Sequence, residues 1–93
     1  MSYFVYIIEC RDGTFYVGHT HDLDQRLSYH AIGIGAHHIT QRGFSRLIHS
    51  EQLPDEKSAV RREMQIKRWS RAKKIALSQG NMAELRALSR SHD

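Results

Sequence analysis

Residues 3–18 predict a β-hairpin, and this feature limits the fold more than any other part of the chain. The first segment, 3–10, is rich in aromatic and β-branched side chains, which suit a pleated and half-buried surface. An Asp-Gly pair follows at 12–13, and glycine tolerates the positive φ that a tight hairpin turn needs. We expect the second strand over residues 15–17, ending at Gly18. The chain therefore starts its fold by building a sheet.

Two tyrosines lie on this hairpin, Tyr6 in the first strand and Tyr16 in the second. On an antiparallel pair of strands their phenols can face the same shallow surface. Composition alone favours the simpler interpretation, in which both are half-buried aromatic residues of the sheet. The residues by themselves leave both interpretations open.

Helices and one further strand are predicted after the hairpin. Asp22 can cap a helix that reaches residue 31 or 32, with Gln25 completing the capping pattern. Two glycines indicate a flexible loop at 33–36, and a polar stretch continues to Gly43. The remaining expected elements are a strand over 44–53, a helix from Asp55 to Trp69, a basic helix over 71–78 capped by Ser70, and a short helix over 82–88.

The 93 residues suffice for one small domain with a modest core. A single cysteine, Cys10, excludes an internal disulfide and fits a reducing compartment. No apolar run approaches the length of a membrane span, and the N-terminus lacks the pattern of a signal peptide. We therefore expect a cytoplasmic protein.

Positive charge is concentrated between residues 61 and 74. The whole chain has a net charge of +4, and this segment alone holds seven Lys or Arg residues against one acid, Glu63. Such a run is often only a solvated helix face. Here it surrounds a single carboxylate, which favours contacts with phosphate groups. The candidate nucleic-acid contacts are Arg61, Arg62, Lys67, Arg68, Arg71, Lys73 and Lys74.

Arg26 and His30 share one face of the helix that starts at Asp22, because they are four residues apart. They lie beside an apolar stripe, so a side chain there can cover the sheet and still meet solvent. The alternative is an arginine at the boundary whose aliphatic stem only shields the core. Spacing does not separate these two interpretations.

Glu63 is the most informative single residue. At about 100° per residue it falls roughly 40° from Ala59, within an apolar arc that runs from Ile66 to Val60 and Met64. A carboxylate on the buried side of a helix is costly unless it is paired or binds a cation. An internal salt bridge, for instance to Arg26, would explain it. The surrounding positive charge favours a metal-binding or catalytic role instead.

Seven histidines raise the question of a zinc site. The pairs His19/His21 and His37/His38 lack the spacing of a structural zinc site, and one cysteine cannot supply the usual thiolates. Positions in surface loops explain most of the histidines better than zinc does.

These motifs together resemble the GIY-YIG nuclease family. Val5-Tyr6-Ile7 and Tyr16-Val17-Gly18 are similar to its paired tripeptides, and Glu63 stands where its metal-binding glutamate falls. The resemblance covers residues 3 to about 79 and is closest to small stand-alone bacterial members. Further matching motifs are Cys10 to Gly13, Arg26-Leu27 with His30, Gly33 to Ala36, Ile66-Lys67 and Ser70 to Lys74.

The resemblance implies an α+β fold, with a three-stranded antiparallel sheet flanked by helices in the order β-β-α-β-α-α. It implies a nuclease domain over 1–80, followed by a short C-terminal helix and tail over 81–93. The implied activity is hydrolysis of phosphodiester bonds in DNA by an endonuclease that uses Mg²⁺ or Mn²⁺. The implied roles are Tyr6 activating water with help from His30, Tyr16 beside the phosphate, Arg26 stabilising its charge, and Glu63 holding the metal ion.

Three features depart from the family pattern. His37-His38 replaces a lysine and a tyrosine, Val17 replaces an isoleucine, and Ile75 stands near the place of a common asparagine. The alternative function is a non-catalytic or partner-dependent nucleic-acid-binding module with the same fold. A domain whose basic helix meets an acidic protein partner is a third option.

Overall fold

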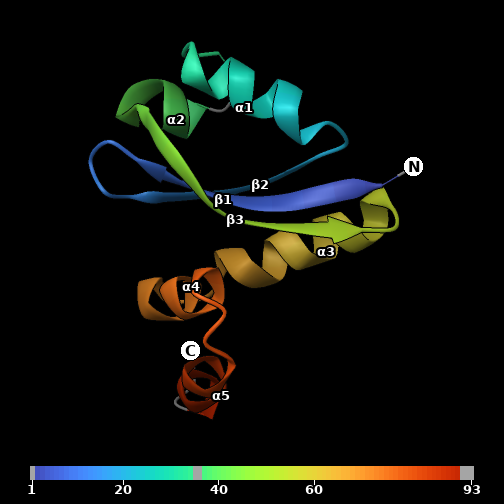
Figure 1. Cartoon of the computed structure of the whole chain (residues 1–93), viewed down its shortest axis with the longest axis vertical. Helices are drawn as coiled ribbons and strands as arrows, with labels where there is room; N and C mark the ends of the chain where they lie inside the picture. The colour runs from blue at the N-terminus through green and yellow to red at the C-terminus, as the bar shows by residue number, and fades with distance from the viewer. Residues whose placement is uncertain (1, 35–36, 91–93) are drawn as a thin grey trace.

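A three-stranded antiparallel sheet lies between two layers of helices (Figure 1). The computed structural model describes residues 2–34 and 37–90. Helices α1 and α2 cover one face of the sheet, α3 and α4 lie on the other, and α5 packs on α4 away from the sheet. The predicted α+β fold is therefore confirmed. The elements are β1 (Tyr3–Cys10), β2 (Phe15–Thr20), α1 (Leu23–Ala31), α2 (His37–Arg42), β3 (Phe44–Leu53), α3 (Glu56–Lys67), α4 (Arg71–Ser78) and α5 (Met82–Arg90).

Strand β1 is the centre of the sheet, between β2 and β3, and it is buried on both faces. Val5 and Ile7 pack into the core beneath α3 and α4, against Ala59 and Ile66. The alternate residues of β1 pack into a second core on the opposite face, beneath α1 and α2, where Ile39 is buried. This two-sided burial explains why β1 reads as a continuous apolar run.

Ile7→Ala is expected to destabilise the fold by about 2–5 kcal/mol, because it removes a fully buried side chain and leaves a cavity in the first core. Urea unfolding followed by circular dichroism measures the change. The matched control is Ile32→Ala, where the side chain is 70% exposed and the expected change is within about 0.5 kcal/mol. Equal unfolding midpoints for the two variants would contradict the burial of Ile7 in the first core.

The predicted hairpin turn is confirmed, with Gly13 at a φ of 85°. The side chain of Asp12 accepts hydrogen bonds from the Thr14 backbone (3.1 Å) and hydroxyl (2.6 Å), and Arg42 donates to its other oxygen (2.8 Å). Strand β2 continues two residues beyond the predicted end at Gly18. Its backbone still pairs with β1 there, so the turn and the pairing fix the register of the whole hairpin.

The predicted helix starts are confirmed as well. Asp22, Asp55 and Ser70 each accept a hydrogen bond from the backbone three residues later. Helix α3 ends at Lys67, two residues before the predicted end at Trp69. No helix in residues 2–34 and 37–90 has the length and apolarity needed to cross a membrane.

The sequence did not predict α2, which replaces the expected polar stretch before Gly43. Its side chain Ile39 is 2% exposed and fills the core beneath α1. Tertiary burial of this one apolar residue stabilises a six-residue helix that local propensity does not favour. Part of the predicted glycine loop, 35–36, lies outside the described residues.

An ion-pair network joins β3 to α3. Glu51 accepts hydrogen bonds from Arg62 (2.8 and 3.0 Å) and bonds to His49 (2.7 Å). These partners outweigh burial and lower the pKa of Glu51 to about 2. Arg62 precedes Glu63 in α3, so the network fixes the part of the helix that carries the candidate metal ligand.

This network predicts that stability is lost in acid. The folded pKa of Glu51 lies below its ordinary value of 4.5, so its contribution is present above that value and is lost as the pH falls toward 2. The contribution is on the order of 2–3 kcal/mol for a carboxylate that is largely buried. Urea unfolding between pH 5 and pH 2 should show a shallower loss for Glu51→Gln than for the unmodified protein. Parallel pH profiles would contradict this assignment.

Candidate active site

Tyr6 and Tyr16 lie on the same face of the sheet, beneath α1 and α2. Tyr6 pairs with Gly18 and Ile8 pairs with Tyr16, so the two tyrosines are diagonal neighbours across the strands. Their ring centroids are 6.2 Å apart. Tyr6 is fully buried and Tyr16 is half-buried, so Tyr16 is the more accessible of the two rings.

Gly18 provides the space that the Tyr6 phenol occupies. A Cβ atom at this position would lie 2.6 Å from the Tyr6 hydroxyl oxygen, 2.8 Å from Tyr6 Cζ and 2.9 Å from Tyr16 Cε2. A Cβ atom essentially never lies within 3.0 Å of a non-bonded heavy atom in a folded protein. The buried Tyr6 ring cannot move aside to relieve the clash. Glycine is therefore required by the close approach of the two tyrosines.

His30 is the hydrogen-bond partner of Tyr6. The Tyr6 hydroxyl lies 3.2 Å from His30 Nε2, and the histidine side chain is 1% exposed. Burial lowers the pKa of His30 and the nearby charge of Arg26 lowers it further, while the backbone of Ile34 opposes both effects. The ring is therefore neutral at pH 7, and its Nδ1 has no hydrogen-bond partner of good geometry within the described residues. Of the histidines within the described residues, only His21 lies outside the helices and strands, so the prediction that most histidines occupy surface loops is wrong.

The direction of this hydrogen bond is set by the protonation of Tyr6 and by which nitrogen of the His30 ring carries hydrogen. Burial raises the pKa of Tyr6 well above its ordinary value, and the charge of Arg26 only partly opposes this. A protonated phenol beside a neutral imidazole donates its hydrogen to the free ring nitrogen. When the imidazole carries its hydrogen on Nδ1, Tyr6 donates and His30 Nε2 accepts, and the bond then offers a route for a proton from the phenol to the imidazole.

Arg26 places a positive charge among these rings. The charge lowers the pKa values of Tyr6, Tyr16 and His30, although burial dominates at each group. Within the described residues, Arg26 has no carboxylate within ion-pair distance. The proposed salt bridge from Glu63 to Arg26 is therefore wrong. An unpaired guanidinium beside the tyrosines is suited to an anionic ligand.

Glu63 forms its ion pairs with other residues. Its Oε1 lies 2.6 Å from His19 Nδ1, its Oε2 lies 2.6 Å from Lys67 Nζ, and the side chain is 15% exposed. Burial raises the pKa of Glu63, but the hydrogen bonds from Lys67 and His19 outweigh it and hold the pKa below its ordinary value. The negative charge also raises the pKa values of Tyr6 and Tyr16, so it acts across the edge strand β2 on the tyrosine pair.

The apolar arc predicted around Glu63 is narrower than expected. Ala59 and Ile66 are fully buried, but Val60 is 36% exposed and Met64 is 52% exposed. The sheet covers only one side of α3, so residues about 100° away from Ala59 already meet solvent. Glu63 consequently lies at the edge of the buried side, where an ion can still reach it.

The residues at Glu63 fit a hydrated hard cation. The carboxylate is ionised, its partners are Lys67 and the His19 ring, and Lys67 is half exposed and can move away at little cost. Among residues 2–34 and 37–90, no three His, Cys, Asp or Glu side chains gather into a group that could hold a metal. A single carboxylate suits Mg²⁺ or Mn²⁺, which keep several waters and bind substrate phosphate oxygens.

His19 and His38 are parts of this region that the sequence did not single out. His19 lies on β2 and reaches Glu63, 44 residues away in the chain. His38, from α2, bonds to Thr14 (3.1 Å), and its ring centroid is 5.9 Å from that of Tyr16. The sequence offered one signal for His19. Residues two apart on a strand point to the same face, so His19 shares the α3 side of β2 with the buried Val17.

The basic run is divided among several roles. Lys73 is only 5% exposed and packs 4.3 Å from the Trp69 ring, and Arg62 is bound to Glu51. Lys67 pairs with Glu63. Burial lowers the pKa of Lys74. Of the seven candidate nucleic-acid contacts, Lys73 is buried and so poorly placed to reach a phosphate, whereas Arg61, Arg68 and Arg71 are exposed.

The three-stranded antiparallel sheet between helical layers makes this chain a compact α+β domain, with two tyrosines and a histidine gathered beneath α1 and α2. The model of one such domain, the GIY-YIG catalytic domain, matches residues 2–76. The chain therefore belongs to the GIY-YIG family, as the motifs predicted.

Its relatives include small proteins named UPF0213. The chain is 43% identical over 77 residues to the UPF0213 protein BH0048 of Halalkalibacterium halodurans, covering 83% of this chain and 82% of that protein. It is 45% identical over 73 residues to a UPF0213 protein of Halobacterium salinarum, covering 78% of this chain and 95% of that protein.

Two solution NMR structures share the fold. The UPF0213 protein BH0048 from Bacillus halodurans superposes with a TM-score of 0.54 at 42% identity, covering 85% of this chain and 84% of that chain. The protein EF2693 from E. faecalis superposes with a TM-score of 0.58 at 26% identity, covering 89% and 88%.

Proposed function

We propose that this chain is a divalent-metal-dependent endonuclease that hydrolyses phosphodiester bonds in DNA. The observation that carries this proposal is the buried hydrogen bond between Tyr6 and neutral His30, close enough to Arg26 for its charge to lower the pKa of both groups. A phenol with a proton acceptor and a guanidinium form a site for activating water against an anionic phosphorus centre. Membership of the GIY-YIG family supports the same chemistry.

In the proposed reaction the proton moves along the observed hydrogen bond. His30 Nε2 accepts the Tyr6 proton as the Tyr6 oxygen accepts a proton from the attacking water. The water oxygen forms a bond to phosphorus, and the bond from phosphorus to one sugar oxygen breaks. That sugar oxygen takes a proton from solvent, and His30 later returns its proton to solvent. Tyr16 lies beside the phosphate and limits the access of further water.

The charge on phosphorus is balanced from two sides. Arg26 donates hydrogen bonds to the phosphate oxygens as negative charge develops on them. Glu63 is the residue that would hold Mg²⁺ or Mn²⁺. Such an ion supplies Lewis-acid stabilisation of the phosphate and of the leaving oxygen. The exposed Arg61, Arg68 and Arg71 contribute sequence-independent contacts to the DNA backbone.

The test is a cleavage assay on single-stranded, duplex and branched DNA, with Mg²⁺, Mn²⁺ or a chelator. Arg26→Ala should reduce the cleavage rate by about 100-fold, the usual cost of removing one stabilising donor from a transition state. The matched control is Arg86→Ala on α5, an exposed arginine outside the site, which should change the rate less than about threefold.

Equal rates for the unmodified protein and Arg26→Ala would indicate a contaminating nuclease. Binding of DNA without cleavage under every metal condition would favour the alternative, a non-catalytic nucleic-acid-binding module. The alternative has one observation in its favour, because exposed cations remain on α3 and α4 whatever the fate of the tyrosine site.

A further inference from the structure

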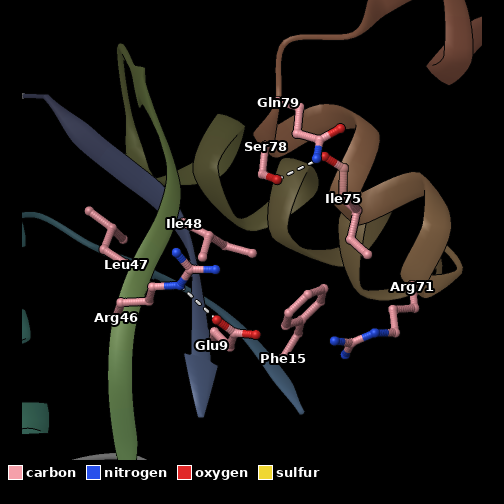
Figure 2. Close-up of a pocket in the computed structure, with 9 residues that line it drawn as sticks. All are labelled: Glu9, Phe15, Arg46, Leu47, Ile48, Arg71, Ile75, Ser78 and Gln79. Carbon is pink, nitrogen blue, oxygen red and sulfur yellow. Dashed lines mark hydrogen bonds and ion pairs between the residues drawn. The ribbon is translucent and has the colours of Figure 1, made fainter. Parts of the chain in front are cut away.

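A cavity of about 470 Å³ lies on the face of the sheet opposite the tyrosine pair. Successive residues of a strand point to opposite faces, so Phe15 lines this cavity while Tyr16 belongs to the tyrosine site. Its walls come from all three strands and from α4, and Figure 2 shows Arg46 with Glu9 on one side and Arg71 on the other. None of the candidate catalytic residues lines it, and of its lining residues only Arg71 has a part in the proposed function, as a contact to the DNA backbone.

Both arginines of the cavity are held in place by interactions that leave donors free. Arg46 Nε bonds to Glu9 at 2.7 Å, and its side chain remains 70% exposed. Arg71 stacks on the Phe15 ring at 4.1 Å from its centroid and donates from one nitrogen to the Gly13 carbonyl at 2.6 Å. Each guanidinium has five N–H donors, so most of them remain for a ligand. Two arginines against one glutamate leave a net positive charge, which selects an anion.

The base of the cavity is apolar. Ile48 of β3 and Ile75 of α4 face it, next to the edge of Phe15 (Figure 2). Gln79, at the end of α4, adds an amide that can donate and accept hydrogen bonds. The volume lies within the usual range of about 300–1,000 Å³ for small-molecule sites. A ligand that matches these walls has an anionic group joined to a flat, largely apolar ring with polar edges.

We propose that this cavity binds a nucleotide, with the phosphate on Arg46 and Arg71 and the base against Ile48 and Ile75. The stacking of the Arg71 guanidinium on Phe15 fixes its plane, so its remaining N–H groups are positioned to donate to phosphate oxygens, while the apolar isoleucines contact the face of the base. The ligand can be a free mononucleotide or one unit of a nucleic-acid strand that passes this face. The proposal does not depend on the nuclease activity.

The experiment is an NMR titration of the whole chain with deoxyadenosine monophosphate, without metal. We expect saturable shifts of the Phe15, Ile48 and Ile75 amides with a dissociation constant of about 1 mM. Deoxyadenosine and inorganic phosphate should each bind at least about fivefold more weakly, because each lacks one half of the ligand. Unchanged amides at about 10 mM nucleotide would overturn the proposal. Equal affinity for phosphate alone would overturn the role of the base.

The choice of variant separates a loss of nucleotide binding from a loss of folding. Arg71 donates to the Gly13 carbonyl in the hairpin turn, so replacing it could disturb the fold. Arg46→Gln changes an exposed side chain and is therefore the main variant, with Arg86→Gln as its matched control. Arg46→Gln should weaken nucleotide binding at least about threefold, whereas Glu9→Gln should not weaken it, because removing a negative charge favours an anion. Unchanged affinity in Arg46→Gln would overturn the phosphate assignment.

A short oligodeoxyadenylate then identifies the source of the nucleotide. Tighter binding of the oligonucleotide than of the mononucleotide assigns the cavity to a strand, and weaker binding assigns it to a free nucleotide. Both results support the cavity as a nucleotide site. Since no cleavage is measured, a failure here is distinct from a failure of the nuclease proposal.

Discussion

Glu63→Gln is expected to reduce the rate of DNA cleavage by at least about 1,000-fold, because the amide keeps the shape of the side chain and loses the charge that holds a metal ion. The carboxylate is ionised, since hydrogen bonds from Lys67 and His19 keep its pKa below the ordinary value despite burial. An uncharged amide is a poor ligand for Mg²⁺. Without the ion, Arg26 alone would face the charge that develops on phosphorus.

The fold should survive this substitution. Glu63 lies at the edge of the buried side of α3, and one of its two partners, Lys67, is half exposed. Loss of such a pair changes the free energy of unfolding by about 1 kcal/mol or less. Urea unfolding therefore shows whether a loss of activity comes from chemistry or from stability.

Glu56→Gln is the matched control for Glu63→Gln. Glu56 lies on the same helix, 4.0 Å from the other nitrogen of His19, and its side chain is 63% exposed. We expect a change in rate of less than about threefold. A direct measurement complements the assay, since Mn²⁺ should broaden NMR signals around Glu63 in the unmodified protein and in Glu56→Gln. Equal broadening in Glu63→Gln would show that the ion binds elsewhere.

Gly18→Ala is expected to combine a loss of activity with a loss of stability. The new methyl group would lie 2.6 Å from the Tyr6 hydroxyl oxygen and 2.9 Å from the Tyr16 ring. Tyr6 is 1% exposed and cannot withdraw without moving the core. Overpacking of this kind costs about 1–3 kcal/mol. Displacement of the phenol from His30 by about 1 Å should lower the cleavage rate by about 100-fold.

Gly80→Ala separates the clash from the general cost of replacing a glycine. Gly80 has a φ of +68°, and a Cβ there meets no atom within 4 Å. The expected loss of stability is about 1 kcal/mol from backbone strain alone, with cleavage unchanged. Activity and stability are measured at a temperature where every variant is folded.

A double variant tests the cause of the Gly18 effect. Tyr6→Phe removes the hydroxyl oxygen that the new methyl group meets first. Gly18→Ala combined with Tyr6→Phe should therefore be more stable than Gly18→Ala alone, although it stays inactive because the proton route to His30 is gone. Wild-type activity in Gly18→Ala would contradict the close packing of the two tyrosines.

Local chemistry made several features predictable from the sequence. The Asp-Gly turn at 12–13 and the caps at Asp22, Asp55 and Ser70 involve partners within a few residues, and the structure contains each of them. The motif positions of Tyr6, Tyr16 and Glu63 identified the family before any contact was known. These signals depend on short spacings, which a linear sequence displays directly.

Long-range partners were the features that the sequence could not predict. The helical wheel of α3 predicted that Glu63 points toward the core. It did not predict that the ion-pair partners of Glu63 are His19 and Lys67 rather than Arg26. It also could not show that the sheet leaves Met64 exposed, because the width of the covering surface depends on how the strands and helix meet.

The hairpin, the helix starts and the family followed from the sequence, because each depends on neighbouring residues or on a fixed pattern. The folded structure was needed to show that Gly18 makes room for the Tyr6 phenol, that His30 lies within hydrogen-bond distance of that phenol, and that α2 forms around a buried Ile39. Those outcomes depend on the distance between groups from separate strands and helices, and packing of the two cores sets that distance.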